Sequence, residues 1–334
     1  MKVTEYCIGF DLGGTKMIAA LVDGEGRILS RARGKTPGED GADAVAAAMA
    51  ETVREVCAEG GIEPSAVRAI GAAVPGVIES GRGTVTLTNL NLKDYPLRDS
   101  LEKALGVKVV LENDVNAGTW AEFSVGAAVG YRHVIGVFVG TGIGGGLVLD
   151  GKLYRGARGA AGEIGHLIIQ DGGPLCGCGQ YGCLEAFASR TAMAKDAVAA
   201  AAAGNLPELI DKTGTDYKKF KSSVFERGLE KGNPTIAKIV DRAAYHLGVG
   251  LANAAMLLNP EAFVIGGGFA DRLREGYLKR VTETMRERTM PFVGKGVKVL
   301  LGSLGDDAVP LGAALLAMEE VNAPRSDSGA GGRP

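Results

Sequence analysis

The feature of this sequence that most limits its fold is a pattern that occurs twice. Residues 6–10 and residues 134–139 are short apolar runs typical of buried strands, and a glycine-rich turn follows each of them. In both copies a second apolar run then leads to an Asp-Gly pair, at Asp23 and at Asp150. An Asp-Gly pair between apolar runs predicts a β-hairpin. The sequence therefore predicts two similar α/β lobes, with a ligand in the cleft between them.

Helical segments continue each lobe. Apolar residues at helical spacing predict helices over residues 43–57, 97–105 and 236–258. The alanine-rich residues 191–203 are helical by propensity, and a final helix is expected over 310–321. Residues 204–232 are predicted to be a polar, irregular surface insertion. We expect an N-terminal lobe over residues 1–118 and a C-terminal lobe over residues 119–307, which contains a loop at 163–185. The last helix, within about residues 308–322, is expected to pack back on the first lobe. Residues 323–334 are expected to form a disordered tail.

Both glycine turns are candidates for phosphate binding, because glycine lets backbone amides approach phosphate oxygens closely. The first turn contains Asp11, Gly13, Gly14, Thr15 and Lys16, and the second, over residues 140–146, contains Gly140, Thr141, Gly142 and Gly144. A strand follows each turn where a Walker or Rossmann motif needs a helix, so neither of those motifs applies. A flexible hairpin without a function is the structural alternative. A carboxylate at Asp11 is suited to hold Mg²⁺ through water.

A third candidate lies where an apolar strand ends at Glu112 and leads through Asn113 and Asp114 into a helix. Ligands of α/β proteins gather at the carboxyl ends of strands. An ordinary Asp, with a pKa of about 3.9, is ionised near neutral pH and can accept a proton from a hydroxyl group. Phosphoryl transfer to an alcohol needs such a carboxylate, phosphate-binding amides and a divalent ion. The structural alternative is that Asp114 only caps the helix.

One histidine and three cysteines lie close together in the sequence, at His166, Cys176, Cys178 and Cys183. A Cys3His set is typical of a closed, structural zinc site, and free thiols beside a solvated histidine are the alternative. Glu163 and Glu185 flank the set, and we expect the metal to hold them in place. Amides and carboxylates can form two hydrogen bonds to neighbouring hydroxyl groups, so they are suited to bind a polyol. The candidates for this role are Asn89, Asn113, Glu163, His166 and Glu185.

The overall charge argues against nucleic-acid binding, since the net charge is -2 and the pI is about 6.0. No segment resembles a signal peptide or a membrane helix. The few cysteines are typical of a reducing cytosol, which predicts a cytoplasmic protein without a membrane partner.

These motifs together resemble the ROK family (repressors, open reading frames, sugar kinases), and the resemblance extends from residue 6 to about residue 321. It implies a two-lobed, actin-like (ribonuclease-H-like) ATPase fold with duplicated cores and a central cleft. It also implies ATP-dependent phosphorylation of a hexose at its 6-hydroxyl, most simply glucose, with Mg-ATP on the glycine turns and Asp114 as general base. The resemblance further implies zinc binding by His166, Cys176, Cys178 and Cys183, and a place near the adenosine for Gly267 and Gly268. It implies sugar binding by Gly76, Asn89, Asn113, Asp114, Glu163, His166 and Glu185. Family members suggest a homodimer or homotetramer.

Three alternatives remain open at this point. The sugar is glucose or another hexose, such as fructose, N-acetylmannosamine or N-acetylglucosamine, because one hydroxyl's orientation decides the choice. The chain has Leu92 where many glucokinases of the family have Trp. A sugar-sensing regulator would need a DNA-reading element, and the first strand begins too early for the family's helix-turn-helix. Polyphosphate in place of ATP would favour a basic track that the composition does not reveal.

Overall fold

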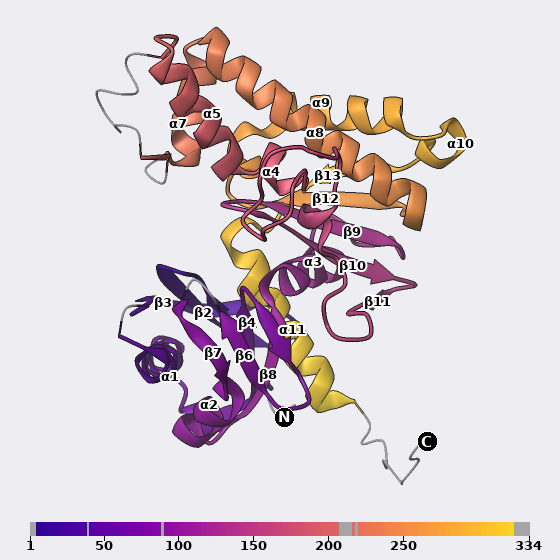
Figure 1. Cartoon of the computed structure of the whole chain (residues 1–334). Coiled ribbons are helices and arrows are strands. Elements are labelled where there is room, and N and C mark those ends of the chain that lie inside the picture. Colours follow the sequence, from indigo (N-terminus) through magenta and orange to yellow (C-terminus); the bar gives the residue numbers. More distant parts are fainter. Residues whose placement is uncertain (1–4, 39, 88–89, 207–215, 218–219, 324–334) are drawn as a thin grey trace, which may run out of the picture. The chain divides into compact units, whose positions relative to one another are not determined.

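The computed structural model describes residues 5–38, 40–87, 90–206, 216–217 and 220–323 (Figure 1). The chain forms two compact units. The N-terminal unit comprises Met1–Asp114 and Ala313–Pro334, and the C-terminal unit comprises Val115–Gly312. The chain thus crosses between units near the start of α3 (Asp114–Ser124) and within α11 (Ala308–Asn322). The predicted boundaries at 118 and 308 lie in these same two helices. The tail from residue 324 lies outside the described residues.

A five-stranded sheet forms the centre of the N-terminal unit, in the order β3-β2-β1-β4-β8. β1 runs antiparallel to β2 and parallel to β4, and β8 continues the parallel part. The strands are β1 (Tyr6–Leu12), β2 (Lys16–Asp23), β3 (Ile28–Lys35), β4 (Val67–Val74) and β8 (Lys108–Asn113). The unit also contains α1 (Ala42–Glu59), η1 (Pro64–Ala66), α2 (Leu97–Leu105) and a small sheet of β5 (Val77–Glu79), β6 (Thr84–Leu87) and β7 (Leu92–Tyr95) that the sequence did not predict.

The C-terminal unit repeats this arrangement in the order β11-β10-β9-β12-β13. β9 runs antiparallel to β10 and parallel to β12, which is parallel to β13, so the predicted duplication is confirmed. The strands are β9 (Val134–Val139), β10 (Ile143–Leu149), β11 (Lys152–Leu153), β12 (Ala262–Gly266) and β13 (Lys298–Leu301). The other elements are η3 (Ile164–His166), α4 (Glu185–Ala188), α5 (Arg190–Ala202), α7 (Ser222–Glu230), α8 (Pro234–Leu258), α9 (Ala270–Arg288), α10 (Pro291–Gly294) and η5 (Gly305–Asp307).

Alternation along the strands assigns the two faces of the N-terminal sheet. Ile8, Phe10 and Ile70 belong to the buried core that includes residues of α1. Gly71 points to the opposite face, where a Cβ would lie 1.9 Å from the carbonyl oxygen of Ala313 in α11. Glycine at this position therefore lets α11 pack directly against the sheet.

Glycines play the same part in the C-terminal sheet. Ile135 and Val137 face the core that contains the buried side chains of α8. On the other face, a Cβ at Gly136 would lie 2.0 Å from Oγ1 of Thr119 in α3. The side chain of Thr119 therefore packs directly against the sheet backbone at this glycine.

Two sequence-based predictions for this unit were wrong in part. The second glycine turn ends at Gly142, because β10 begins at Ile143 and includes Gly144 and Gly146. These strand glycines make room for α3, since a Cβ at Gly144 would lie 2.5 Å from Cγ2 of Val115. The predicted irregular insertion over 204–232 contains the helix α7 and the fully buried Phe220 and Phe225, whose burial holds that segment on the core.

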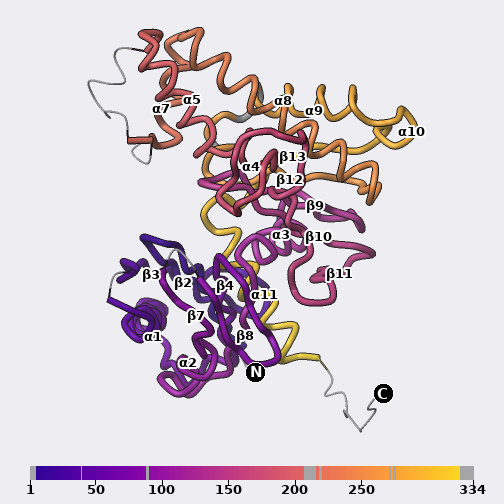
Figure 2. The backbone as a smooth tube through the Cα atoms, viewed as in Figure 1, coloured from indigo at the N-terminus to yellow at the C-terminus, as the bar shows by residue number. Residues whose placement is uncertain are grey.

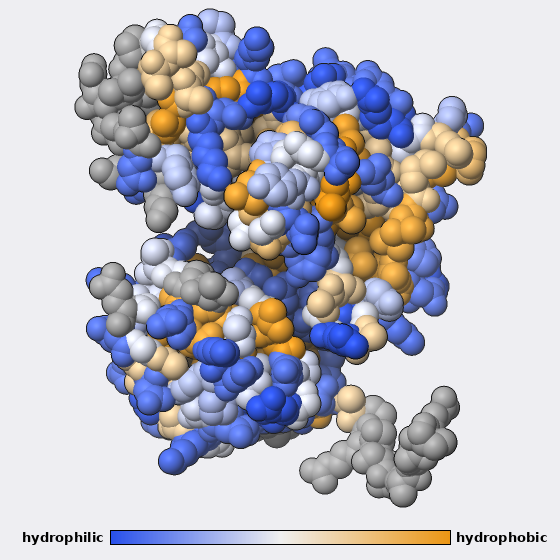
Figure 3. Space-filling view, viewed as in Figure 1, coloured by the Kyte–Doolittle hydropathy of each residue, from blue (hydrophilic) through white to orange (hydrophobic). Residues whose placement is uncertain are grey.

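The long helix α8 follows the prediction because both of its ends are encoded locally. The side chain of Asn233 accepts hydrogen bonds from the N–H groups of Thr235 and Ile236, and Pro234 occupies the first turn. At the other end Asn259 adopts a left-handed conformation with φ 45°. Exposed apolar side chains gather at α10 and at this end of α8 (Figure 3), namely Met256, Leu257, Met290 and Phe292. Among the described helices, none has the length and apolar character needed to span a bilayer.

Candidate functional site

The first glycine turn links β1 to β2 in the N-terminal unit and comprises residues 13–15, since Lys16 already belongs to β2. Thr36 fixes this turn. Its hydroxyl donates to the carbonyl oxygen of Gly13 at 2.7 Å, and its N–H donates to that of Thr15 at 3.2 Å. A Cβ at Gly13 would lie 2.6 Å from the Lys16 carbonyl oxygen, so only glycine fits there. The turn is a fixed structure rather than a flexible hairpin.

The carboxyl ends of three parallel strands bring the other candidates of this unit to one sheet edge. Asp11 pairs with Ala73 of β4, and the next residue of β4, Val74, pairs with Asn113 of β8. Since neighbouring strands lie about 4.8 Å apart, the Cα atoms of Asp11 and Asn113 are separated by roughly 10 Å. Asp114 follows as the first residue of α3, which leaves Asn113 at the position of the cap.

Two further sugar-site candidates belong to the same unit. Gly76 follows β4 at this edge, and a Cβ there would lie 2.5 Å from the carbonyl oxygen of Thr86 in β6. Asn89 lies outside the described residues.

The zinc loop, residues 163–185, belongs to the C-terminal unit and runs from the residues after β11 into α4 without a long helix or strand (Figure 2). A tight turn shapes its tip, where Cys176 N–H donates to Gln180 O at 2.8 Å and Gly179 N–H donates to Cys176 O at 3.1 Å. Gly179 and Gly182 have φ 91° and 80°. Gly177, which lies between Cys176 and Cys178, has no positive φ.

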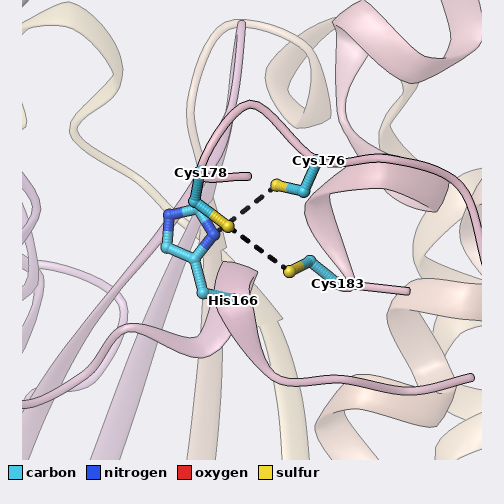
Figure 4. Close-up of side chains that lie close together, drawn as sticks. All are labelled: His166, Cys176, Cys178 and Cys183. Carbon is cyan, nitrogen blue, oxygen red and sulfur yellow. Dashed lines mark hydrogen bonds between the residues drawn. The ribbon is translucent and has the colours of Figure 1, made fainter. Parts of the chain in front are cut away.

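The four predicted metal ligands converge in this loop (Figure 4). Their ligand atoms all lie within 4.8 Å of one another. Cys176 Sγ lies 3.7 Å from His166 Nδ1, and Cys178 Sγ lies 3.7 Å from Cys183 Sγ. A zinc tetrahedron with bonds of about 2.3 Å to sulfur has edges of roughly 3.8 Å. The spacing and chemistry of the donors therefore fit a tetrahedral zinc ion.

The three thiols of the loop differ in how readily they ionise when no metal is bound. Burial raises the pKa of Cys176 to about 12 and raises that of Cys183, whereas a hydrogen bond with the Gln180 backbone lowers the pKa of Cys178. Two buried thiols thus resist ionisation in the protein alone. A bound dication reverses this preference, because thiolates are the form that ligates metal.

Carboxylates and the second nitrogen of His166 surround the cluster. Glu163 is exposed, and its Oε2 lies 4.0 Å from His166 Nε2, the nitrogen that does not face Cys176. Glu185 Oε1 lies 3.6 Å from Cys176 Sγ. Its Oε2 accepts a hydrogen bond of 2.9 Å from the N–H of Ile143, directly after the second glycine turn. Glu185 therefore connects the zinc loop to that turn.

The second glycine turn, residues 140–142, lies next to Gly267 and to the start of α5. Gly267 has φ 90°, and a Cβ there would lie 2.7 Å from Val139 O. The hydroxyl of Thr191 donates to Thr141 O at 2.6 Å, and the N–H of Arg190 donates to Gly140 O at 3.0 Å. At the next residue, Gly268, no atom lies within 4 Å of the place where a Cβ would be. The C-terminal unit thus gathers the turn, Gly267 and Glu185 in one region.

Sequence analysis missed three residues that fix this machinery, namely Thr36, Arg190 and Thr191. Their partners lie 23 or more positions away in the chain, so no local pattern identifies them. The only local signal is at α5, where Ser189 precedes the helix and its side chain accepts from Ala192 N–H.

Comparison with known proteins gives consistent matches over almost the whole chain. A family model, described as ROK family, matches residues 7–320. A glucokinase from Streptomyces coelicolor is 36% identical over 325 residues, covering 93% of this chain and 97% of that protein. An N-acetylmannosamine kinase from Salmonella typhi is 34% identical over 317 residues, covering 94% and 99%.

Among solved structures, a ROK family glucokinase from Streptomyces griseus in complex with glucose and AMPPNP aligns with a TM-score of 0.82. It is 35% identical and the match covers 94% of this chain and 99% of that one. The duplicated sheets and this likeness define an α/β protein with the actin-like ATPase fold, as the sequence predicted. The chain belongs to the ROK family.

Proposed function

We propose that the protein transfers the γ-phosphoryl group of ATP to the 6-hydroxyl of glucose. That it is an ATP-dependent sugar kinase follows from its family and its relatives. The choice of glucose is supported by the Streptomyces relatives, of which one is named a glucokinase and the other is a glucokinase that binds glucose. The residue roles below are part of the proposal.

The observation that carries the mechanism is the position of Asp114 at the carboxyl end of β8. It shares this sheet edge with Asp11 and with the fixed glycine turn after β1. In our proposal the Asp114 carboxylate accepts the proton of the attacking sugar hydroxyl. Asp11 would hold Mg²⁺ through water, and the ion would neutralise charge on the phosphates.

ATP binding is assigned to backbone groups of both glycine turns. The proposed phosphate-binding residues are 13–16, 140–142 and Gly144. The adenosine is proposed to lie near Gly267 and Gly268. Gly140 and Gly268 support this, because no described atom lies within 4 Å of the place where their Cβ would be, so a ligand can approach the backbone closely there.

Zinc, in our proposal, is structural and supports sugar binding. His166, Cys176, Cys178 and Cys183 would hold it, and a closed site of this type leaves no coordination position for a substrate. Since Nδ1 of His166 faces the thiols, Nε2 is left to contact a sugar hydroxyl beside Glu163. Glu185, Gly76, Asn89 and Asn113 are the other proposed sugar contacts.

The test is a coupled assay with ATP and Mg²⁺ over a panel of hexoses, run on the natural protein and on Asp114→Asn. We expect turnover on glucose, and a loss of at least about 10²–10⁴-fold in kcat for the variant with ATP affinity within about threefold. An active variant would refute the assignment of the base.

N-acetylmannosamine is the second candidate substrate, because a relative of that specificity is nearly as similar to the chain. Turnover on this sugar in place of glucose would keep the mechanism and change the substrate. Binding of a sugar without turnover on any hexose would favour a sugar-sensing regulator.

A further inference from the structure

Arg190 is the one residue of α5 that donates hydrogen bonds to the second glycine turn from both its backbone and its side chain. It is the first residue of the helix, and its N–H donates to Gly140 O at 3.0 Å. Its Nη2 donates a short hydrogen bond to Oγ1 of Thr141, and its Nη1 donates to Phe220 O at 2.9 Å. The guanidinium is thereby held beside residues 140–142.

The charge of this guanidinium is not compensated by the protein. Its acceptors are a hydroxyl and a carbonyl, both neutral, and within the described part of the chain no carboxylate pairs with it. The group is half-buried, and burial lowers the pKa of Arg190. Arginines that leave water are normally paired with an anion.

Hydrogen-bond donors near the turn are also in excess. Gly140 N–H donates to Gly142 O and Ile143 N–H donates to Glu185, but the N–H groups of Thr141 and Gly142 meet no acceptor among the described residues. A guanidinium has five N–H donors, of which Arg190 uses two here. The turn therefore presents unused backbone and side-chain donors next to an uncompensated positive charge.

We propose that Arg190 is a further substrate-contacting residue of the kinase reaction, whose guanidinium binds the phosphate groups of the nucleotide on the turn of residues 140–142. This inference rests on the proposed function, which assigns ATP to the same turn. The chemistry matches, because a planar guanidinium pairs with phosphate oxygens by charge-assisted hydrogen bonds. The hydrogen bonds to Thr141 and Phe220 would hold the fork in a fixed orientation before the nucleotide arrives.

The test measures the affinity for Mg-ATP and for glucose by calorimetry in Arg190→Met, Arg190→Lys and the natural protein. We expect Mg-ATP to bind about 10- to 100-fold more weakly to Arg190→Met, the range of a charge-assisted contact. Arg190→Lys should bind with intermediate affinity, since it keeps the charge and loses the fork. Glucose affinity should stay within about twofold in both variants. Raising the salt concentration should weaken ATP binding less in Arg190→Met than in the natural protein.

Two matched variants separate phosphate binding from mere support of the turn. Arg272→Met removes an exposed arginine that pairs with Glu226 in the same unit, and it should leave ATP affinity unchanged. Thr191→Val removes a hydrogen bond to the turn and keeps the charge of Arg190. If Thr191→Val weakens ATP binding as much as Arg190→Met, or if Arg190→Met behaves like Arg272→Met, the inference is wrong. Failure of the natural protein to bind Mg-ATP would instead overturn the proposed function.

Discussion

Glu122 of α3 is a buried carboxylate whose removal should measurably destabilise the C-terminal unit. Only 2% of the residue is exposed. Oε1 accepts hydrogen bonds from the N–H groups of Ser303 and Leu304 at 2.8 and 2.9 Å. Oε2 accepts from Ala127 N–H at 2.8 Å and from the Ser303 hydroxyl at 3.2 Å. The side chain thus ties the end of α3 to the segment between β13 and η5.

The size of the effect follows from the change Glu122→Gln, which keeps the shape and replaces one oxygen by an NH2 donor. In either orientation, that donor faces at least one N–H group whose acceptor is gone. Leaving a buried N–H unsatisfied costs about 1–3 kcal/mol, and the remaining bonds lose their charge assistance. Relief from burying a charge offsets part of this, so we expect a loss of about 3 kcal/mol. For a unit of about 200 residues this corresponds to a fall in Tm of roughly 6–12 °C.

The assay is differential scanning calorimetry at neutral pH, with Glu283→Gln as the matched control. Glu283 lies in the same unit, is half exposed and pairs only loosely with Lys279, at 3.9 Å. A surface pair of this kind is worth about 0–1 kcal/mol, so the control should move Tm by no more than a few degrees. If Glu122→Gln and Glu283→Gln shift Tm equally, the hydrogen bonds of Glu122 do not stabilise the unit as argued.

Two further predictions concern the metal and the pH dependence. Elemental analysis should find roughly one zinc ion per chain, which Cys183→Ser should lose and which the control Cys57→Ser, at a buried cysteine, should retain. Chelation of the zinc should lower both Tm and glucose affinity. Zinc retained by Cys183→Ser would contradict the ligand assignment. Although burial raises the pKa of Asp23, hydrogen bonds with Arg27 and Glu25 lower it below its ordinary value. The Asp23 carboxylate therefore stabilises the fold above about pH 4, and this stabilisation is lost as the pH falls through the lowered pKa. Calorimetry from about pH 2 to 7 should show that Tm falls less steeply at acid pH in Asp23→Asn than in the natural protein. An equal fall in Tm for both proteins would count against this.

Much of the fold was predictable because it is written in local patterns. The Asp-Gly pair at 150–151 occupies the hairpin between β10 and β11, with φ of 54° and 73°. Asn233 and Asn259 delimit α8 through capping, which needs only neighbouring residues. The four candidate zinc ligands could be named for a similar reason, since they lie within one short segment of chain.

The roles of some glycines and the burial of residues 204–232 depend on which segments pack against each other, and these predictions were wrong in part. Gly144 and Gly146 look like turn residues, yet they belong to β10 and give α3 access to the sheet. Residues 204–232 look polar and irregular, but Phe220 and Phe225 are completely buried. A glycine has the same local signature whether it bends the chain or admits a helix.

The sequence by itself thus determined the duplicated strand pattern, the ends of α8 and the grouping of the candidate metal ligands, because hydrophobic period, capping and ligand spacing act over a few residues. Only the tertiary structure decided that Glu122 meets Ser303, 181 positions away, and that Arg190 meets Thr141. Such contacts depend on the packing of whole helices and strands, and the residues that make them carry no distinguishing pattern of their own.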